Sequence, residues 1–231
     1  MKKSLLILSI IALFAIMSTT SNAQKLSKFG SSIEKQVGPK TVKVPYTDVI
    51  SYLGYAQTGE EDQIVDSKKF YYIYIWVPLA APELGIRMMS PVDPKYKNKS
   101  AIQSTKYKDN SKSKDYFDTY ITLERSNIFT ADKISDEAAK SAKWMVLSRN
   151  DDSSEMPKQP SGRAYNSLLR YKSVLGDPTK ALTAGLYRVG FTTYKTGDVK
   201  GTFLAEVAAP IKLPGVVMSK TIAGILEGIN K

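Results

Sequence analysis

The sequence predicts a mainly β protein, an antiparallel β-sandwich with a few α-helices. Two segments carry this prediction: residues 70–91 and 185–207 are dense in aromatic and β-branched side chains and have turn-forming residues at their ends. A third observation supports it, because residues 116–125 alternate between apolar and polar side chains with the period of a strand.

The N-terminal residues have the pattern of a secretory signal. Two lysines precede an apolar run over residues 5–17, and small and polar residues follow as far as Ala23. We therefore expect a signal peptide over residues 1–23 and a single β-sandwich domain with a C-terminal helix over residues 24–231. Neither this run nor any later apolar segment reaches the about 20 residues that a transmembrane helix needs, so no transmembrane span is expected.

The sequence contains no cysteine and no histidine. Disulfides, a lipid-carrying cysteine, the usual zinc ligands and the Ser-His-Asp and Cys-His catalytic groups are therefore excluded. We expect an exported protein of the periplasm, the cell surface or the extracellular space that is not lipid-anchored. We also expect it not to be an enzyme, and to build any site from oxygen ligands and shape.

The elements of the first half follow from local pattern. Residues 25–40 are polar with two glycines and a proline, so we expect a mobile lead-in. Residues 42–55 alternate around Pro45 and Gly54, which favours one or two short strands near a sheet edge. Residues 57–63 predict a polar loop. Residues 70–77 are apolar on both faces, which predicts a central strand, and residues 85–89 predict another strand.

The middle of the chain alternates loops with regular elements. Residues 91–114 are rich in lysine and predict a long exposed loop, and residues 116–125 predict a strand. Residues 131–145 are free of glycine and proline, which predicts a surface helix capped by Thr130 or Ser135. A second polar loop is expected over residues 149–162, and a strand over residues 164–172.

The C-terminal part predicts a hairpin and a helix. Residues 187–193 and 199–207 alternate on either side of the turn-forming sequence Thr196-Gly197-Asp198, which predicts a β-hairpin. After two prolines, four apolar residues recur at helical spacing and predict a short amphipathic helix: Ile222, Ile225, Leu226 and Ile229.

Five strings carry a resemblance to a known family. They are YYIYIWVP, ELGIRMMSP, YFDTYITLER, AYNSLLR and GLYRVGFTTYKTGDVKGTF, in this order along nearly the whole domain. In these strings the chain resembles the major leptospiral surface lipoprotein family, described as surface lipoprotein of Spirochaetales order, although it lacks the lipidation cysteine. The resemblance implies a jelly-roll-like sandwich, a calcium site and a surface role that includes attachment to extracellular-matrix proteins.

The resemblance also implies which residues bind Ca²⁺. An Asp-Thr pair, two loop aspartates and a tyrosine would hold the ion, here Asp118, Thr119, Asp151, Asp152 and Tyr165. Calcium takes about six to eight oxygen ligands, and a strand end that faces a polar loop can supply them. The family has a longer run of aspartates in this loop, so a weaker site, or none, remains open. Without the resemblance, these residues would read as a solvated turn, a strand residue and a core aromatic.

Other partners are suggested by composition. Seven lysines and two tyrosines interleave over residues 95–114, which would suit an anionic polymer, although a solvated loop is the simpler interpretation. Export argues against nucleic acid as the partner. The tyrosine-rich strand over residues 70–76 is either a core strand or a stacking platform for sugars, which keeps a carbohydrate-binding protein as an alternative.

Two further hypotheses belong to other functional classes. A glycan-active enzyme would use a pair of carboxylates such as Glu83, Glu124 or Asp198, since that chemistry needs no histidine. A homodimer would form through exposed sheet edges. The resemblance implies an extracellular-matrix protein as the ligand, and the composition keeps a glycan as the other expected ligand.

Overall fold

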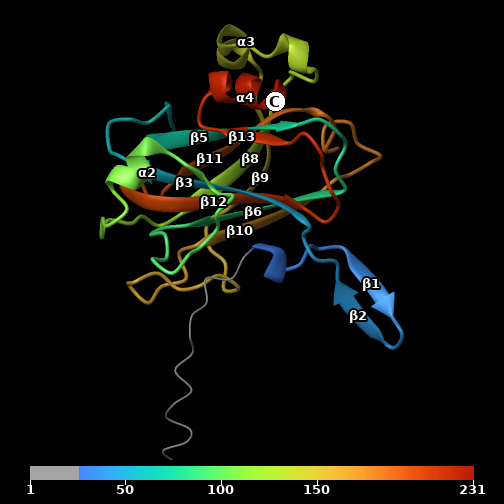
Figure 1. The fold of residues 1–231 in the computed structure, drawn as a ribbon, viewed down its shortest axis with the longest axis horizontal. Coiled ribbons are helices and arrows are strands. Elements are labelled where there is room, and N and C mark those ends of the chain that lie inside the picture. The colour runs from blue at the N-terminus through green and yellow to red at the C-terminus, as the bar shows by residue number, and fades with distance from the viewer. Residues whose placement is uncertain (1–25) are drawn as a thin grey trace, which may run out of the picture.

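A computed structural model describes residues 26–231 and shows a β-sandwich, which confirms the predicted fold class (Figure 1). One sheet has five strands in the order β10-β6-β12-β3-β7, and the other runs β13-β5-β11-β8-β9 with β4 beside β5. The strands of the first sheet are β3 (Asp48–Ala56), β6 (Glu83–Met89), β7 (Ile102–Gln103), β10 (Ser167–Lys172) and β12 (Gly201–Ala209). Those of the second are β4 (Gln63–Val65), β5 (Lys68–Val77), β8 (Tyr120–Arg125), β9 (Met145–Asn150), β11 (Gly185–Thr192) and β13 (Val217–Ser219).

The connectivity is of the jelly-roll type. Most successive long strands alternate between the two sheets, and every described strand pair is antiparallel except the short pair of β3 with β7. The predicted signal peptide over residues 1–23 lies outside the described residues. Among the described residues, no helix is long and apolar enough to span a bilayer.

The core between the sheets is aromatic. Phe191 on β11 and Phe203 on β12 meet across the sandwich with ring centroids 4.7 Å apart, and Phe117 and Tyr71 stack on Phe191 at 5.9 and 5.4 Å. Burying a side chain of this size stabilises the fold by about 1.5–3 kcal/mol. This contact ties the two sheets together at their middle strands.

The predicted hairpin over residues 187–207 is wrong. β11 pairs with β5 and β8, whereas β12 pairs with β3 and β6 in the other sheet. Each strand is buried along its whole length, so each needs neighbours on both sides and a covered face above and below. The turn at Thr196-Gly197-Asp198 therefore carries the chain from one sheet to the other.

The strand predicted over residues 70–77 forms β5, which is largely buried and has a paired neighbour on each side, as expected of a central strand. β5 lies between β11 and the three-residue strand β13. The predicted strands near residues 42–55 and 85–89 correspond to β3 and β6. Only the two-residue strand β7 lies beyond β3, so the expected position near an edge is confirmed.

The predicted mobile lead-in over residues 25–40 is wrong for the residues that the structure describes. A 3₁₀ turn, η1 (Leu26–Lys28), places Leu26 and Phe29 in an apolar cluster on the outer face of the five-stranded sheet. The Leu26 amide donates to Glu206 Oε2 at 3.1 Å. The hairpin of β1 (Glu34–Val37) and β2 (Lys40–Lys43) is exposed throughout and projects from the body (Figure 1).

The predicted loop over residues 91–114 is more ordered than its composition suggests. It contains β7 and a one-turn helix, α2 (Thr105–Asp109), whose N-cap Ser104 accepts from the Tyr107 amide. Tyr96 donates its hydroxyl to Glu206 Oε1 at 2.7 Å, so this tyrosine anchors the loop to β12. Lysine content predicted the exposure of the loop but not these anchors.

The predicted helix over residues 131–145 is shorter than expected. The chain forms a 3₁₀ turn, η2 (Ala131–Lys133), and then α3 (Asp136–Ser141), where Ser135 caps the helix by accepting from the Ala138 amide. The last residues expected in the helix instead open strand β9, which ends at Asn150. Pairing with β8 overrides the helical propensity of this segment, and the polar loop accordingly begins at Asp151.

The C-terminal helix α4 (Ile222–Ile229) forms where the pattern predicts it. Thr221 caps it by accepting from the Gly224 amide, and Ile222 and Ile225 are buried against Trp76 and Leu186. Together, α3 and α4 cover one part of the outer face of the six-stranded sheet (Figure 1).

Candidate functional site

The five residues expected to bind calcium come together at the start of β8. The Thr119 amide and hydroxyl both donate to the Tyr165 carbonyl, each at 3.0 Å. Ser167 Oγ lies 2.9 Å from Thr119 Oγ1 and donates to the Asp151 carbonyl at 2.7 Å. The segment before β8, the loop after β9 and the segment before β10 are thus joined at one point.

Asp118 is the residue of this group whose carboxylate is least well stabilised. Its side chain is half-buried, and Oδ1 is buried without a hydrogen-bond partner among the described residues. Burial, followed by the negative charges of Asp152 and Asp151, raises the pKa of Asp118 to about 6, although Lys68 opposes the shift. Burial and Asp151 also raise the pKa of Asp152. Three carboxylates close enough to repel one another leave this end of the sandwich deficient in positive charge.

The oxygen atoms of these five residues are ligands that a hard cation such as Ca²⁺ prefers, but the three carboxylates do not point to one common position. Among the described residues, no group of three or more acidic side chains is arranged so that it could hold a metal ion. Asp151 Oδ1 accepts from the Asp152 amide at 3.0 Å, and the Tyr165 carbonyl is occupied by Thr119. The partnerless oxygen of Asp118 is the feature that fits an ion with oxygen ligands.

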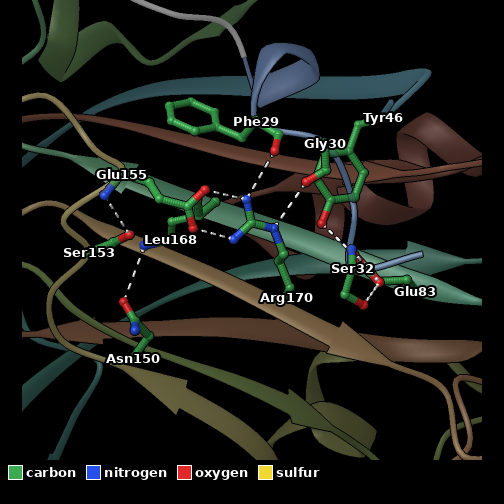
Figure 2. A network of polar contacts seen from close by, with 10 residues as sticks. All are labelled: Phe29, Gly30, Ser32, Tyr46, Glu83, Asn150, Ser153, Glu155, Leu168 and Arg170. Carbon is green, nitrogen blue, oxygen red and sulfur yellow. Dashed lines mark hydrogen bonds and ion pairs between the residues drawn. The ribbon is translucent and has the colours of Figure 1, made fainter. Parts of the chain in front are cut away.

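The acidic loop is fastened to the sheet beside this group (Figure 2). Glu155 forms a bidentate ion pair with Arg170 of β10 at 2.7 and 3.0 Å. The same guanidinium donates to the carbonyls of Phe29 and Gly30 at 3.1 and 3.0 Å. Asn150 accepts from the Leu168 amide at 3.2 Å. The chain is therefore held at Asn150 and at Glu155, on either side of Asp151 and Asp152.

The carboxylates considered for catalysis are not brought together. Glu83, on the five-stranded sheet, accepts from the Tyr46 hydroxyl at 2.6 Å and from the Ser32 amide (Figure 2). Glu124, on the other sheet, pairs with Arg188, and Asp198 pairs with Lys69 at 2.6 Å. Each acid therefore has its own structural partner.

A cavity lies on the outer face of the six-stranded sheet. We call it the outer cleft: a cavity of about 700 Å³ whose floor includes Arg188 of β11 and Glu124 of β8. Trp144 and Tyr74 lie at the end near α3. Of these four residues, only Tyr74 belongs to the segment, residues 70–76, for which a sugar-stacking platform was predicted. The outward alternation of β8 was a signal for Glu124, whereas Arg188 and Trp144 join the cleft only through the three-dimensional fold.

The lysine-rich segment does not form an aromatic binding surface. All seven of its lysines are exposed, whereas Tyr96 and Tyr107 are half-buried and pack on the cluster that holds Leu26. The tyrosines therefore serve packing, and the lysines keep a solvated surface.

One comparison with known families gives a match. The family model described as surface lipoprotein of Spirochaetales order matches residues 40–218, a range that contains all five expected calcium ligands and the outer cleft. No curated protein matches the chain.

Proposed function

Because the chain belongs to the family described as surface lipoprotein of Spirochaetales order, we propose that it is an exported, non-catalytic binding protein stabilised by Ca²⁺. Its ligand is an extracellular-matrix protein or a component of the envelope. It acts at the cell surface, in the periplasm or outside the cell, without a lipid anchor, since the sequence has no cysteine. Glu83, Glu124 and Asp198, the acids considered for catalysis, each have a different structural partner, which supports a binding role over glycan hydrolysis by any pair of them.

One observation carries the calcium part of the proposal: the buried, partnerless Oδ1 of Asp118 beside two further aspartates. A divalent cation would supply that oxygen with a partner and neutralise the mutual repulsion of the three carboxylates. Asp118, Asp151 and Asp152 would hold it through carboxylates, and Thr119 and Tyr165 through neutral oxygens. The loop aspartates turn toward Asp118 when the ion binds.

Thermal unfolding in calcium and in chelator tests the site. A free calcium concentration of about 100 times Kd stabilises the folded state by about 2.7 kcal/mol, and a chain of this size should then gain about 5–10 °C in Tm. The double variant Asp151→Ala, Asp152→Ala should lose the gain, whereas Asp109→Ala on the exposed helix α2 should keep it. Identical melting curves in calcium and chelator would remove the metal from the proposal.

A homodimer is a second proposal, and the edge strand β9 supports it. Met145 and Val146 are exposed on this strand, which among the described strands pairs only with β8. Exposed apolar side chains on a sheet edge favour association with another strand. Light scattering should give twice the chain mass, and Val146→Lys should return it to the monomer. A monomer in the unaltered protein would reject the dimer.

A further inference from the structure

We infer that the outer cleft binds a short neutral oligosaccharide, with Trp144 and Tyr74 stacking on the sugar and the Arg188–Glu124 pair bonding its hydroxyls. The inference deepens the proposed binding role by naming a ligand class and a site. It is independent of the calcium proposal.

The outer cleft lies on a part of the six-stranded sheet that α3 and α4 leave uncovered. Leu26 and Phe29 cover part of the outer face of the five-stranded sheet, and α3 and α4 cover Trp76 and Leu186 on the six-stranded sheet. Between α3 and the β4 strand, the sheet is left open as a cavity of about 700 Å³, which lies within the usual range for ligand sites.

The floor of the outer cleft is a rigid polar pair. Arg188 and Glu124 are 9% and 5% exposed and are joined by contacts of 2.8 Å from Nε and 2.7 Å from Nη2 to the same carboxylate oxygen. Thr122 donates to the other oxygen of Glu124 at 2.8 Å. A buried ion pair gives little net stability compared with apolar packing, so stability alone does not account for its place under an open cavity.

Aromatic rings hold this pair in position. The Arg188 guanidinium carbon lies 3.6 Å from the Tyr72 ring centroid and 4.2 Å from that of Trp144. Trp144 is fixed by a bond of 3.1 Å from Nε1 to the Ala139 carbonyl, and its ring lies 6.0 Å from that of Tyr74. Gly190 permits this packing, because a Cβ there would lie 2.5 Å from Thr122 Oγ1 and 3.0 Å from the Tyr72 ring.

The lining matches a sugar better than an anionic polymer. Its charged side chains nearly balance, with four basic and three acidic groups: Lys68, Lys140, Arg149, Arg188, Asp62, Asp66 and Glu124. Sugar hydroxyls both donate and accept, so they can use carboxylate and guanidinium groups together. Three half-buried aromatic residues line the same cavity and offer faces for the C–H side of a pyranose ring, namely Tyr74, Tyr120 and Trp144, while Phe70 and Tyr72 are buried beneath them.

The two tryptophans of the chain allow a direct test. Trp144 lines the outer cleft, whereas Trp76 is buried under α4, so the variant Trp76→Phe leaves one tryptophan that reports on the cleft. Titration with cellotriose, maltotriose, N,N′-diacetylchitobiose and a heparin tetrasaccharide should give a saturable emission change with at least one neutral sugar. The matched variant Trp144→Phe, which keeps only Trp76, should give none.

Calorimetry with the responding sugar completes the test. Trp144→Ala should weaken binding about tenfold, since one aromatic contact contributes up to about 1.5 kcal/mol. Phe129→Ala, which removes an exposed aromatic outside the outer cleft, should leave affinity unchanged. No response to any neutral sugar at millimolar concentration, or a response only to the heparin fragment or a gelatin peptide, would overturn the inference. If no neutral sugar bound but Tm still rose with calcium, the sugar inference would be rejected and the calcium proposal kept. If a sugar bound but calcium left Tm unchanged, the calcium proposal would be rejected and the sugar inference kept.

Discussion

Asp118 links metal binding to proton binding. Its carboxylate is most stable when a proton or a cation neutralises it, because Oδ1 lacks a hydrogen-bond partner among the described residues and Asp151 and Asp152 lie nearby. Protons and calcium therefore compete for the same oxygen, and calcium affinity should weaken as the pH falls below about 6.

The substitution Asp118→Asn should change how stability depends on pH. The folded state raises the pKa of this carboxyl from 3.8 to about 6, so between these values the folded chain binds more protons than the unfolded chain. In chelator, its contribution therefore makes the free energy of unfolding fall as the pH rises through this window. Asn should remove this contribution, raise the neutral-pH Tm in chelator and abolish the calcium response. Thermal melts across the window measure all three effects.

A matched substitution makes this measurement specific. Asp66 is exposed in the β4–β5 turn with φ of 48°, a conformation that asparagine tolerates, so Asp66→Asn should keep the pH slope and the calcium response. If the free energy of unfolding of Asp118→Asn depended on pH as it does in the unaltered protein, the carboxylate of Asp118 would be solvated and its pKa would not be raised.

At the scale of elements, strand β10 connects the N-terminal segment to the acidic loop through Arg170. The substitution Arg170→Ala removes the bidentate pair with Glu155 and the bonds to the Phe29 and Gly30 carbonyls. We expect a loss of about 2–3 kcal/mol in the free energy of unfolding, since bonds to a charged group are the stronger kind. Hydrogen exchange should show lost protection in both connected segments.

A neighbouring lysine provides the control for Arg170. Lys172→Ala removes an exposed cation from the same strand and should leave exchange unchanged in both segments. If Arg170→Ala loosened only the acidic loop, Leu26 and Phe29 would be shown to hold the N-terminal segment through apolar packing alone.

The sequence predicted the strands better than their partners. The density of aromatic and β-branched residues over residues 70–77, 187–193 and 199–207 predicts strands, and the structure confirms β5, β11 and β12 there, although β11 and β12 are buried throughout and not on one face only. This density does not report pairing, so two strands that are consecutive in the chain were assigned to one hairpin although they lie in facing sheets. Leu26 and Phe29 were missed because two apolar residues in a polar segment make no periodic pattern.

The candidate sites differ in how far the sequence could reveal them. A family resemblance named the five expected calcium ligands, and the structure brings them to one end of the sandwich. The outer cleft depends on strand order, since β5, β11 and β8 place Tyr72, Arg188 and Glu124 side by side. Trp144 reaches them only because α3 ends early and the chain turns into β9.

At the scale of the whole molecule, we predict that residues 24–231 unfold as a single domain. The main core cluster draws side chains from both sheets, so neither sheet keeps its inner face covered without the other. Differential scanning calorimetry should show one transition with equal calorimetric and van't Hoff enthalpies, of about 0.7 kcal/mol per residue. Two resolved transitions would show that the sheets, or the projecting β1–β2 hairpin, form separate units.

The placement of β11 and β12 also bears on when the chain can fold during its synthesis. Each lies in the interior of its sheet, and both come from residues 185–209, near the C-terminus. β11 lies between β5 and β8, and β12 lies between β3 and β6, so neither pair of strands can be joined into a sheet until the ribosome has made β11 and β12. The nascent polypeptide should therefore stay open for most of its synthesis, a state that suits threading through a protein-conducting channel before the sandwich closes.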